Sequence, residues 1–209
     1  MKKFIPRPFP LLKKILHQVN KGTALDIGAG NGRNISYLVK NRFEVTAIDI
    51  NPQNIKQLKN LSSQFKLNFD IKKIDVRKFK FLTKKYDLIL AIQSLIWTRK
   101  SEFLEIIKNI KTSLKINGVA IISGFTIKDP SYLNLKSIKT PIEKNTFYSQ
   151  SEKRFWQFLE HQELKKYFQE NFEILYYKEK LVKDKPHDKI SHPHCHVIAE
   201  IAAKKMRDI

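Results

Sequence analysis

The sequence predicts one α/β domain built on a Rossmann-like, doubly wound and mostly parallel β-sheet. Its 209 residues are 42% hydrophobic, which suits a single globular domain spanning residues 1–209. Along the first 125 residues, short apolar runs alternate with helical patterns, as in successive βαβ units. Three of the six glycines lie in the motif GAGNG, between the first apolar run and the first helical pattern. Open α/β sheets bind ligands at such turns.

Four strands and two helices are predicted in the first half of the chain. The strands are expected at residues 23–27, 45–50, 66–73 and 88–92. The helices are expected at residues 31–41 and 51–61, because apolar residues recur there at helical spacing. Pro52 supports the second helix, since proline is favoured in a first helical turn.

In the second half, Ser101 is the expected N-cap of an amphipathic helix that leads through a turn into a strand at residues 119–123. Residues 125–158 are polar with interspersed aromatic residues, and so long a connection is typical of a lid or binding insertion, where we expect substrate selectivity. The last elements are a helix at residues 162–169, a strand at 173–179, a His-rich connection and a strand at 196–203.

Composition argues against several classes of protein. The one cysteine, Cys195, allows no intramolecular disulfide, and the basic leader at residues 1–21 turns polar before an apolar core of secretory length. The apolar stretch at residues 86–97 is shorter than the roughly 20 residues of a membrane-spanning helix, and it contains Asp87 and Gln93. We therefore expect a cytoplasmic protein without membrane insertion, whose amphipathic leader packs on the sheet or caps the ligand site.

The chain is strongly basic, with 40 Lys and Arg against 20 Asp and Glu and a formal charge of +20. This charge is compatible with a nucleic-acid partner. The lysines are nevertheless spread through the chain beside abundant Ile and Asn, as a general compositional bias would produce. The charge is therefore weak support for binding nucleic acid.

The glycine motif and two acids at strand ends indicate a nucleotide-like ligand. Glycine permits positive φ and close approach of a ligand, and the following helix start offers unpaired N–H groups. Asp49 ends the second strand about 20 residues later, where a carboxylate can bind ribose hydroxyls. Asp75, at the end of the third strand, either accepts from the amino group of an adenine or forms a turn. The spacing G-x-G-x-G and the lack of a phosphate loop disfavour NAD and ATP.

Three segments resemble the class I S-adenosylmethionine-dependent methyltransferases. LDIGAGNGRN is similar to their glycine-rich motif, AIDI to their acidic second strand, and YDLILAIQSLIW to their fourth strand. The resemblance implies a seven-stranded sheet with an antiparallel last strand beside strand five, and S-adenosylmethionine as cofactor. PRPFPLLKKI, GRNISYL and the terminal PHDKISHPHCHVIAEIAAKK further resemble tellurite-resistance and thiopurine-type methyltransferase-like proteins. Residues 125–158 match no member, so the resemblance implies no particular substrate.

The resemblance also implies where the cofactor binds. It places Asp26, Gly28, Gly30 and Gly32 around the methionine part, Gln93 at its end, Asp49 and Ile50 at the ribose, and Asp75 and Val76 at the adenine, with Ala29 and Asn34 completing the set. Arg33 and Asn34 match an R-N pair of the family, whereas Ala29 stands where the family often has cysteine.

Methyl transfer requires alignment of the reactants more than a catalytic constellation, because the donor is already activated and a base is needed only for a protonated nucleophile. The connection between the last two strands contains His187, His192, His194 and His196 beside Cys195. His192, His194, His196 and Trp97 are the candidates for the acceptor side, and the identity of any catalytic residue stays open. No C-x-x-C or H-E-x-x-H spacing occurs, so no metal site is expected.

Three function classes follow. The narrower resemblance favours methyl transfer to a small-molecule nucleophile, such as a thiol or a metalloid, by in-line displacement. The basic charge leaves an RNA, DNA or protein methyltransferase as an alternative, although AIQSLIW stands where base N-methylation would require a [DNS]-P-P-[YFW] motif. A non-catalytic protein that binds S-adenosylmethionine is the third class.

Overall fold

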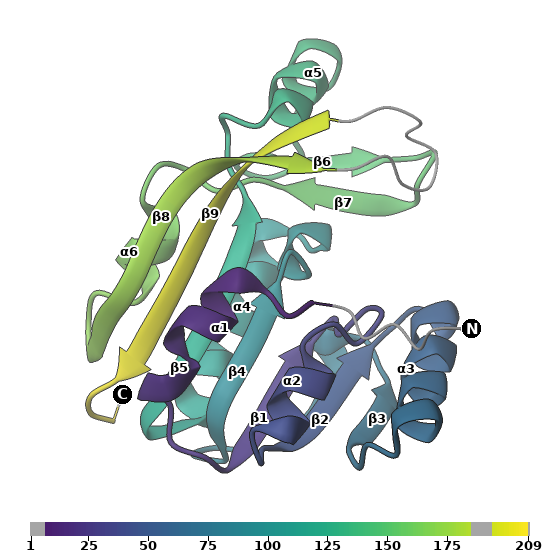
Figure 1. Ribbon diagram of the computed structural model, residues 1–209. Coiled ribbons are helices and arrows are strands. Elements are labelled where there is room, and N and C mark those ends of the chain that lie inside the picture. Colours follow the sequence, from purple (N-terminus) through teal and green to yellow (C-terminus); the bar gives the residue numbers. More distant parts are fainter. Residues whose placement is uncertain (1–6, 185–193, 209) are drawn as a thin grey trace.

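The structure is a computed structural model that describes residues 7–184 and 194–208 (Figure 1). A seven-stranded sheet with the order β3-β2-β1-β4-β5-β9-β8 forms its centre. The strands are β1 (Thr23–Ile27), β2 (Glu44–Asp49), β3 (Asp70–Lys73), β4 (Tyr86–Ile92), β5 (Leu114–Phe125), β8 (Phe172–Asp184) and β9 (His194–Lys205). Strands β1 to β5 are parallel, and β9 is antiparallel to both β5 and β8. The predicted doubly wound sheet with an antiparallel last strand beside strand five is confirmed.

Helices cover both faces of this sheet. The helices on the sheet are α1 (Pro10–Ile15), α2 (Ile35–Lys40), α3 (Pro52–Phe65), α4 (Lys100–Ser113) and α6 (Glu163–Tyr167). Helix α5 (Pro130–Ile138) lies beyond the end of the sheet, and the 3-10 helices are η1 (Leu16–Gln18), η2 (Val76–Lys78) and η3 (Leu95–Trp97). One apolar cluster joins α1, α2 and α3 to one face, and a second joins α4 and α6 to the other. Leu11, Leu12 and Ile15 are buried in the first cluster, so the leader packs on the sheet. In the described part of the chain, no helix has the length and apolarity to span a membrane.

Two boundaries near the glycine motif differ from the predictions. The first helix begins at Ile35 rather than at residue 31, because the glycine turn occupies the intervening residues. Helix α3 continues to Phe65, and Lys66 ends it in the left-handed conformation with φ of 52°. Strand β3 therefore starts only at Asp70, and the alternating apolar pattern that precedes it lies in the connection.

The prediction that Ser101 is the N-cap of this helix is wrong, because Arg99 is the N-cap of α4. The backbone N–H of Arg99 donates to Glu102 Oε2 at 2.8 Å, which gives the reciprocal bond of a capping box. Ser101 instead binds Glu143 from the insertion, with its backbone N–H 2.8 Å from Glu143 Oε2. The start of α4 is thereby attached to residues 42 positions further along the chain.

Residues 125–158 include α5 and a two-stranded hairpin of β6 (Thr146–Ser149) and β7 (Arg154–Gln157). Figure 1 shows this hairpin beyond the end of the sheet at which β4 and β5 finish. Trp156 of β7 packs edge to face against Trp97 of η3, with ring centroids 4.7 Å apart. Tyr132 and Phe147 are buried in a third apolar cluster and form the core of the insertion. The hairpin is therefore fixed above the loop that follows β4.

A buried ion pair holds α6 against α4. Lys100 Nζ lies 2.5 Å from Glu163 Oε1, and the Tyr167 hydroxyl donates to the same carboxylate. Burial lowers the pKa of Lys100, which shows that its charge is poorly solvated. Burial alone would raise the pKa of Glu163, but the hydrogen bonds from Lys100 and Tyr167 hold it below its ordinary value.

We expect Glu163→Gln to lower the free energy of unfolding by about 3 to 5 kcal/mol, because Lys100 would keep a buried charge without a counterion. Urea denaturation monitored by circular dichroism measures this change. Glu170→Gln removes the same charge from an exposed position and is the matched control. Equal stability of the two variants would contradict a structural role for the pair.

Candidate functional site

The glycine motif forms the turn between β1 and α2 and is attached to the next strand. The backbone N–H groups of Gly28 and Ala29 both donate to the Ile48 carbonyl, at 2.8 and 3.0 Å. Gly28, Gly30 and Gly32 all have positive φ, between 58° and 77°. Side chains rarely adopt this conformation, so the turn depends on glycine.

Two of these glycines have different neighbours. A Cβ atom on Gly30 would meet only the Gly28 carbonyl oxygen, at 4.0 Å, so the backbone here faces open space. A Cβ atom on Gly32 would lie 2.6 Å from Leu61 Cδ2 and 2.9 Å from Leu58 Cδ2 of α3. Gly30 therefore leaves room for a ligand, whereas Gly32 allows close packing of the turn on α3.

Asp49, the last residue of β2, joins the glycine turn to the start of α3. Its Oδ2 atom accepts from the Gly30 N–H at 2.9 Å and from Asn54 Nδ2 at 3.1 Å, and its Oδ1 atom accepts from the Asn51 N–H at 2.8 Å. A carboxylate has about four acceptor positions, so these three donors leave capacity for a ligand hydroxyl. Asp49 is thus both a brace for the turn and a candidate ligand group.

A cavity of about 540 Å³ opens beside this turn. Its lining includes eight predicted site residues, namely Gly28, Gly30, Asp49, Ile50, Asp75, Val76, Gln93 and Trp97. It also includes Phe155 of the aromatic insertion and seven residues that sequence reasoning missed: Asn51, Asn54, Arg77, Ser94, Thr98, Lys153 and Arg154. Asn51 and Asn54 follow the strand-end acid and could have been suspected, but the pattern around Lys153 carries no recognisable ligand motif.

Four predicted cofactor residues, Asp26, Ala29, Gly32 and Asn34, do not line the cavity. Asn34 Nδ2 lies 3.5 Å from Asp26 Oδ2, and Asn34 Oδ1 accepts from the Phe9 N–H at 3.0 Å. Ala29 is part of the apolar core. These residues support the turn from behind and attach the leader to it.

Asp26 is almost fully buried beneath the turn. Burial raises its pKa from the ordinary value of 3.8 to about 7, against the lowering effects of Asn34 and Arg33. The folded protein therefore keeps a proton on Asp26 at pH values where the unfolded chain releases it. Through this group, the free energy of unfolding falls as the pH rises from about 4 to about 7.

We expect Asp26→Asn to become more stable relative to the wild type as the pH rises. The amide is neutral at every pH, so the difference in free energy of unfolding should grow towards alkaline pH, to about 4 kcal/mol at most. Urea denaturation of both proteins between about pH 4 and about pH 7 measures the difference. A difference independent of pH would contradict the raised pKa.

Asp75 forms a turn, one of the two alternatives that its sequence position suggested. Its carboxylate caps η2 by accepting from the Arg77 N–H at 2.9 Å, and it also accepts from Arg77 Nε at 2.9 and 3.0 Å. These bonds lower the pKa of Asp75, with the Arg77 side chain as the largest cause. Asp75 is therefore a turn-forming carboxylate that also lines the cavity.

Gln93 and Ser94 form the cavity wall after β4. Gln93 adopts a left-handed conformation with φ of 53°, and its N–H donates to the Ser123 carbonyl at 3.0 Å. Ser94 Oγ is buried and has no hydrogen-bond partner among the residues that the structure describes. Ser94 lies next to Gly28. A Cβ atom added to Gly28 would be only 2.4 Å from Ser94 Cβ. This hydroxyl is available to a polar ligand atom.

The candidates for the acceptor side are placed differently from one another. His192 and the neighbouring His187 lie outside the described residues, and His194 begins β9. The His196 ring stacks on Phe125 with centroids 4.3 Å apart, and its Nδ1 atom is 3.0 Å from Asp129 Oδ2. His196 does not line the cavity, whereas Trp97 does. Within residues 7–184 and 194–208, no three His, Cys, Asp or Glu side chains are grouped as metal ligands.

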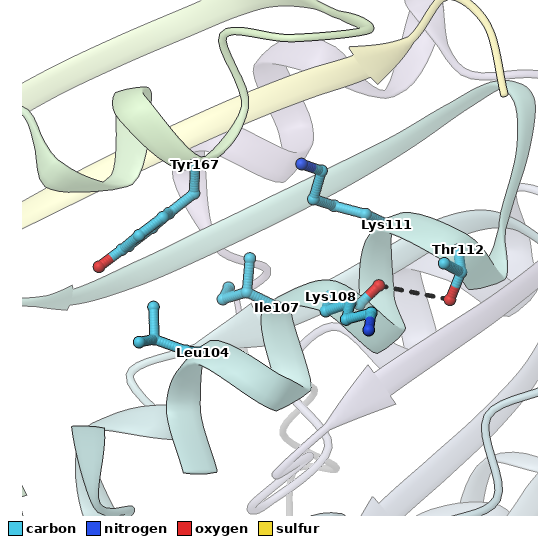
Figure 2. Close-up of a pocket in the computed structure, with 6 residues that line it drawn as sticks. All are labelled: Leu104, Ile107, Lys108, Lys111, Thr112 and Tyr167. Carbon is cyan, nitrogen blue, oxygen red and sulfur yellow. Dashed lines mark hydrogen bonds between the residues drawn. The ribbon is translucent and has the colours of Figure 1, made fainter. Parts of the chain in front are cut away.

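A smaller cavity of about 200 Å³ lies between α4 and Tyr167 of α6 (Figure 2). Its wall is mostly apolar, formed by Leu104, Ile107 and the chains of Lys108 and Lys111. The Thr112 hydroxyl is turned to the Lys108 carbonyl at 3.3 Å. None of the predicted site residues takes part, and no acidic group lines it to receive a ribose.

The larger cavity suits a nucleoside with a polar tail. Ile50, with 59% of its surface exposed, provides an apolar wall next to the Asp49 carboxylate. The open space at Gly30 admits the ligand close to the backbone, and the unpaired Ser94 hydroxyl offers a polar contact. These features suit S-adenosylmethionine, which joins an adenosine to a charged methionine part.

The sheet order and the cavity at the glycine turn are those of a class I S-adenosylmethionine-dependent methyltransferase. Residues 24–118 match the family model described as "Methyltransferase domain". The fold and this match, which covers somewhat under half of the chain, are similar to those of the class I methyltransferases, which use S-adenosylmethionine as methyl donor.

The relatives of this chain include two bacterial proteins. Malonyl-[acyl-carrier protein] O-methyltransferase 2 of Ilyobacter polytropus is 29% identical over 78% of this chain and 59% of its own. The probable S-adenosyl-L-methionine-dependent methyltransferase TehB of Haemophilus influenzae is 27% identical over 66% of this chain and 47% of its own. The chain thus spans about half of the length of these relatives.

Solved structures share the fold. The TehB crystal structure superposes with a TM-score of 0.74 and 22% identity over 94% of this chain and 62% of TehB. A 1,6-didemethyltoxoflavin-N1-methyltransferase of Burkholderia thailandensis superposes with a TM-score of 0.65 and 18% identity, covering 94% of this chain and 76% of that one. That structure contains bound 1,6-didemethyltoxoflavin and S-adenosylhomocysteine. The predicted resemblance to TehB-like proteins is confirmed.

Proposed function

We propose that this protein transfers a methyl group from S-adenosylmethionine to a small-molecule nucleophile. One observation carries the proposal: the glycine turn and the hairpin of the insertion line the same cavity. Its volume of about 540 Å³ lies within the range of small-molecule sites. The edge of the sheet supplies the donor side, and η3 with the hairpin supplies the acceptor side, which we define as Trp97, Thr98, Lys153, Arg154 and Phe155.

The residues of this chain act mainly by placing the reactants. Asp49 accepts from the ribose hydroxyls and keeps the turn in shape, while Gln93 and Ser94 lie between the donor side and the acceptor side. When bound, S-adenosylmethionine supplies an electrophilic methyl group: a lone pair of the acceptor forms the new bond while the carbon–sulfur bond breaks, and that bonding pair remains on the sulfur of S-adenosylhomocysteine. Alignment of this kind accounts for a large part of such a rate.

The β6–β7 hairpin also makes one side of the cavity apolar. Trp156 packs against Trp97, and Trp97 and Phe155 bring apolar surface to the side of the cavity away from the glycine turn. Exclusion of water from this side protects the donor from hydrolysis and strengthens electrostatic interactions. A nucleophile that is already ionised needs no base, and any proton of a neutral nucleophile passes to water or to a nearby base.

The names of the relatives support a small acceptor. The Burkholderia enzyme is named for 1,6-didemethyltoxoflavin and binds it, and the Ilyobacter enzyme is named for a malonyl group carried on a protein. Both acceptors present a small reactive group. Applied to this chain, the acceptors of these two enzymes favour a substrate whose reactive group enters the cavity. They disfavour a large polymer bound on the basic surface.

The test is calorimetric titration with S-adenosylmethionine and S-adenosylhomocysteine, followed by transfer assays with small thiols, metalloid oxyanions and RNA. We expect saturable binding of both nucleosides and methylation of a small acceptor. Failure to bind either nucleoside would overturn the cofactor assignment. Binding with methylation of RNA alone would replace the proposal by its alternative, and binding without transfer to any acceptor would favour a non-catalytic protein.

A further inference from the structure

We propose that the acceptor is a small organic anion with an apolar, preferably aromatic body, and that Lys153 is the residue that selects its charge. This inference rests on the proposed function, because it assigns a substrate class to the acceptor side of the same cavity. It is drawn from the charges and rings that the β6–β7 hairpin brings to that cavity.

The hairpin turn directs three consecutive residues to the cavity. Lys153 has a left-handed conformation with φ of 52°, and the chain then enters β7 at Arg154. Lys153, Arg154 and Phe155 all line the cavity, together with Trp97 of η3. The acceptor side therefore combines two cationic side chains with two aromatic rings.

The two cations are held in different ways. The Arg154 guanidinium lies over the Trp97 ring, 3.7 Å from its centroid, and pairs with Glu152 through bonds of 3.1 and 3.0 Å. The same Glu152 carboxylate accepts from Trp156 Nε1 at 2.7 Å. Arg154 is thus fixed in place and its charge is compensated by a carboxylate that does not line the cavity.

Lys153 has no such compensation. It is exposed, and it forms no ion pair with any residue that the structure describes. The acidic residues of the cavity lining, Asp49 and Asp75, belong to the donor side and are already engaged, Asp49 by the turn and Asp75 by Arg77. Among the residues that the structure describes, no carboxylate lines the acceptor side, so the positive charge of Lys153 faces the acceptor without a counterion.

This arrangement favours one charge type of acceptor. The methyl donor is itself a cation, so a cationic acceptor would meet two like charges in the cavity, that of the donor and that of Lys153. An anionic acceptor would pair with Lys153 and would also reduce the repulsion between Lys153 and the donor. Trp97 and Phe155 provide the apolar wall for the body of such a molecule.

The test uses a matched pair of probes at pH 7, 4-hydroxybenzoate and 4-hydroxybenzamide, which share the ring and a protonated hydroxyl group and differ by one charge. Each is titrated calorimetrically into the full chain saturated with S-adenosylhomocysteine. We expect the carboxylate to bind about 5-fold more tightly than the amide, and added salt to weaken only the carboxylate. Equal affinity, tighter binding of the amide, or binding of neither probe would overturn the proposal.

The variants assign the preference to one residue. Lys153→Gln should remove most of the roughly 5-fold preference, and Lys153→Arg should retain it. Lys166→Gln, which removes one charge from an exposed position on α6, should behave as the wild type. A preference that survives in Lys153→Gln would contradict the role of this residue.

The two proposals fail in different ways. Binding of S-adenosylhomocysteine alone is measured first, in the wild type and in every variant. If the wild type did not bind S-adenosylhomocysteine, the proposed function itself would be refuted. Normal binding of S-adenosylhomocysteine with no preference between the probes would leave the methyltransferase assignment in place and refute only the anionic acceptor.

Discussion

Replacing Asp49 by alanine is expected to raise the Kd for S-adenosylhomocysteine at least about 100-fold. Two ribose hydroxyls would each lose a hydrogen bond to a charged group, at about 1.5 kcal/mol or more per bond. The Gly30 and Asn51 N–H groups would also lose their common acceptor, so the turn would be less well ordered before binding. Calorimetric titration of the purified variant measures the change.

The control for this experiment is Asp70→Ala, which removes an exposed carboxylate from β3. It should bind as the wild type does. Circular dichroism and thermal unfolding of Asp49→Ala show whether the fold persists, and Asp49→Asn provides a less disruptive variant that keeps one acceptor oxygen. Unchanged affinity in a folded Asp49→Ala variant would remove the ribose assignment.

Alanine at Gly30 is expected to impair mainly binding, whereas alanine at Gly32 is expected to impair mainly stability. At Gly30 the new Cβ atom enters open space, so stability should fall only by about 1 to 2 kcal/mol from the left-handed backbone. The methyl group would occupy room that the ligand needs, and the Kd for S-adenosylhomocysteine should rise by about 10-fold or more.

At Gly32 the Cβ atom would collide with Leu58 and Leu61, so the free energy of unfolding should fall by about 3 kcal/mol or more. Its side chain would face α3 rather than the cavity, and folded protein should keep more of its affinity than Gly30→Ala does. Urea denaturation and calorimetry on both variants separate these outcomes. Equal losses of affinity and stability in both would refute the distinction between a ligand glycine and a packing glycine.

The sheet could be predicted because its signals are local. Strand β1 was predicted with its observed bounds, and the predicted second and fourth strands overlap β2 and β4. A continuous apolar run between turn residues has few other stable arrangements. Boundaries were less accurate where a side-chain bond decides them, as at Arg99, whose capping bond to Glu102 replaced the expected cap at Ser101.

The donor side of the site was likewise accessible from sequence, since each βα turn of a parallel sheet opens at the same edge. Gly28, Gly30 and Asp49 line the cavity for this reason. Whether a predicted residue lines the cavity or supports it from behind was not accessible. Asp26 and Gly30 are four positions apart in the motif, yet one is buried beneath the turn and the other faces open space.

By itself, the sequence determined the α/β class, the glycine turn and the strand-end acid, because apolar periodicity and the backbone freedom of glycine act over a few residues. Only the tertiary structure decided which side chains form the acceptor side. Trp97 and Arg154 are far apart in the chain, and they meet because aromatic packing fixes the β6–β7 hairpin over η3. Whether the charge of Lys153 faces the cavity without a counterion is also decided by the tertiary structure. Ion pairing depends on neighbours in space and follows no periodic pattern in the sequence.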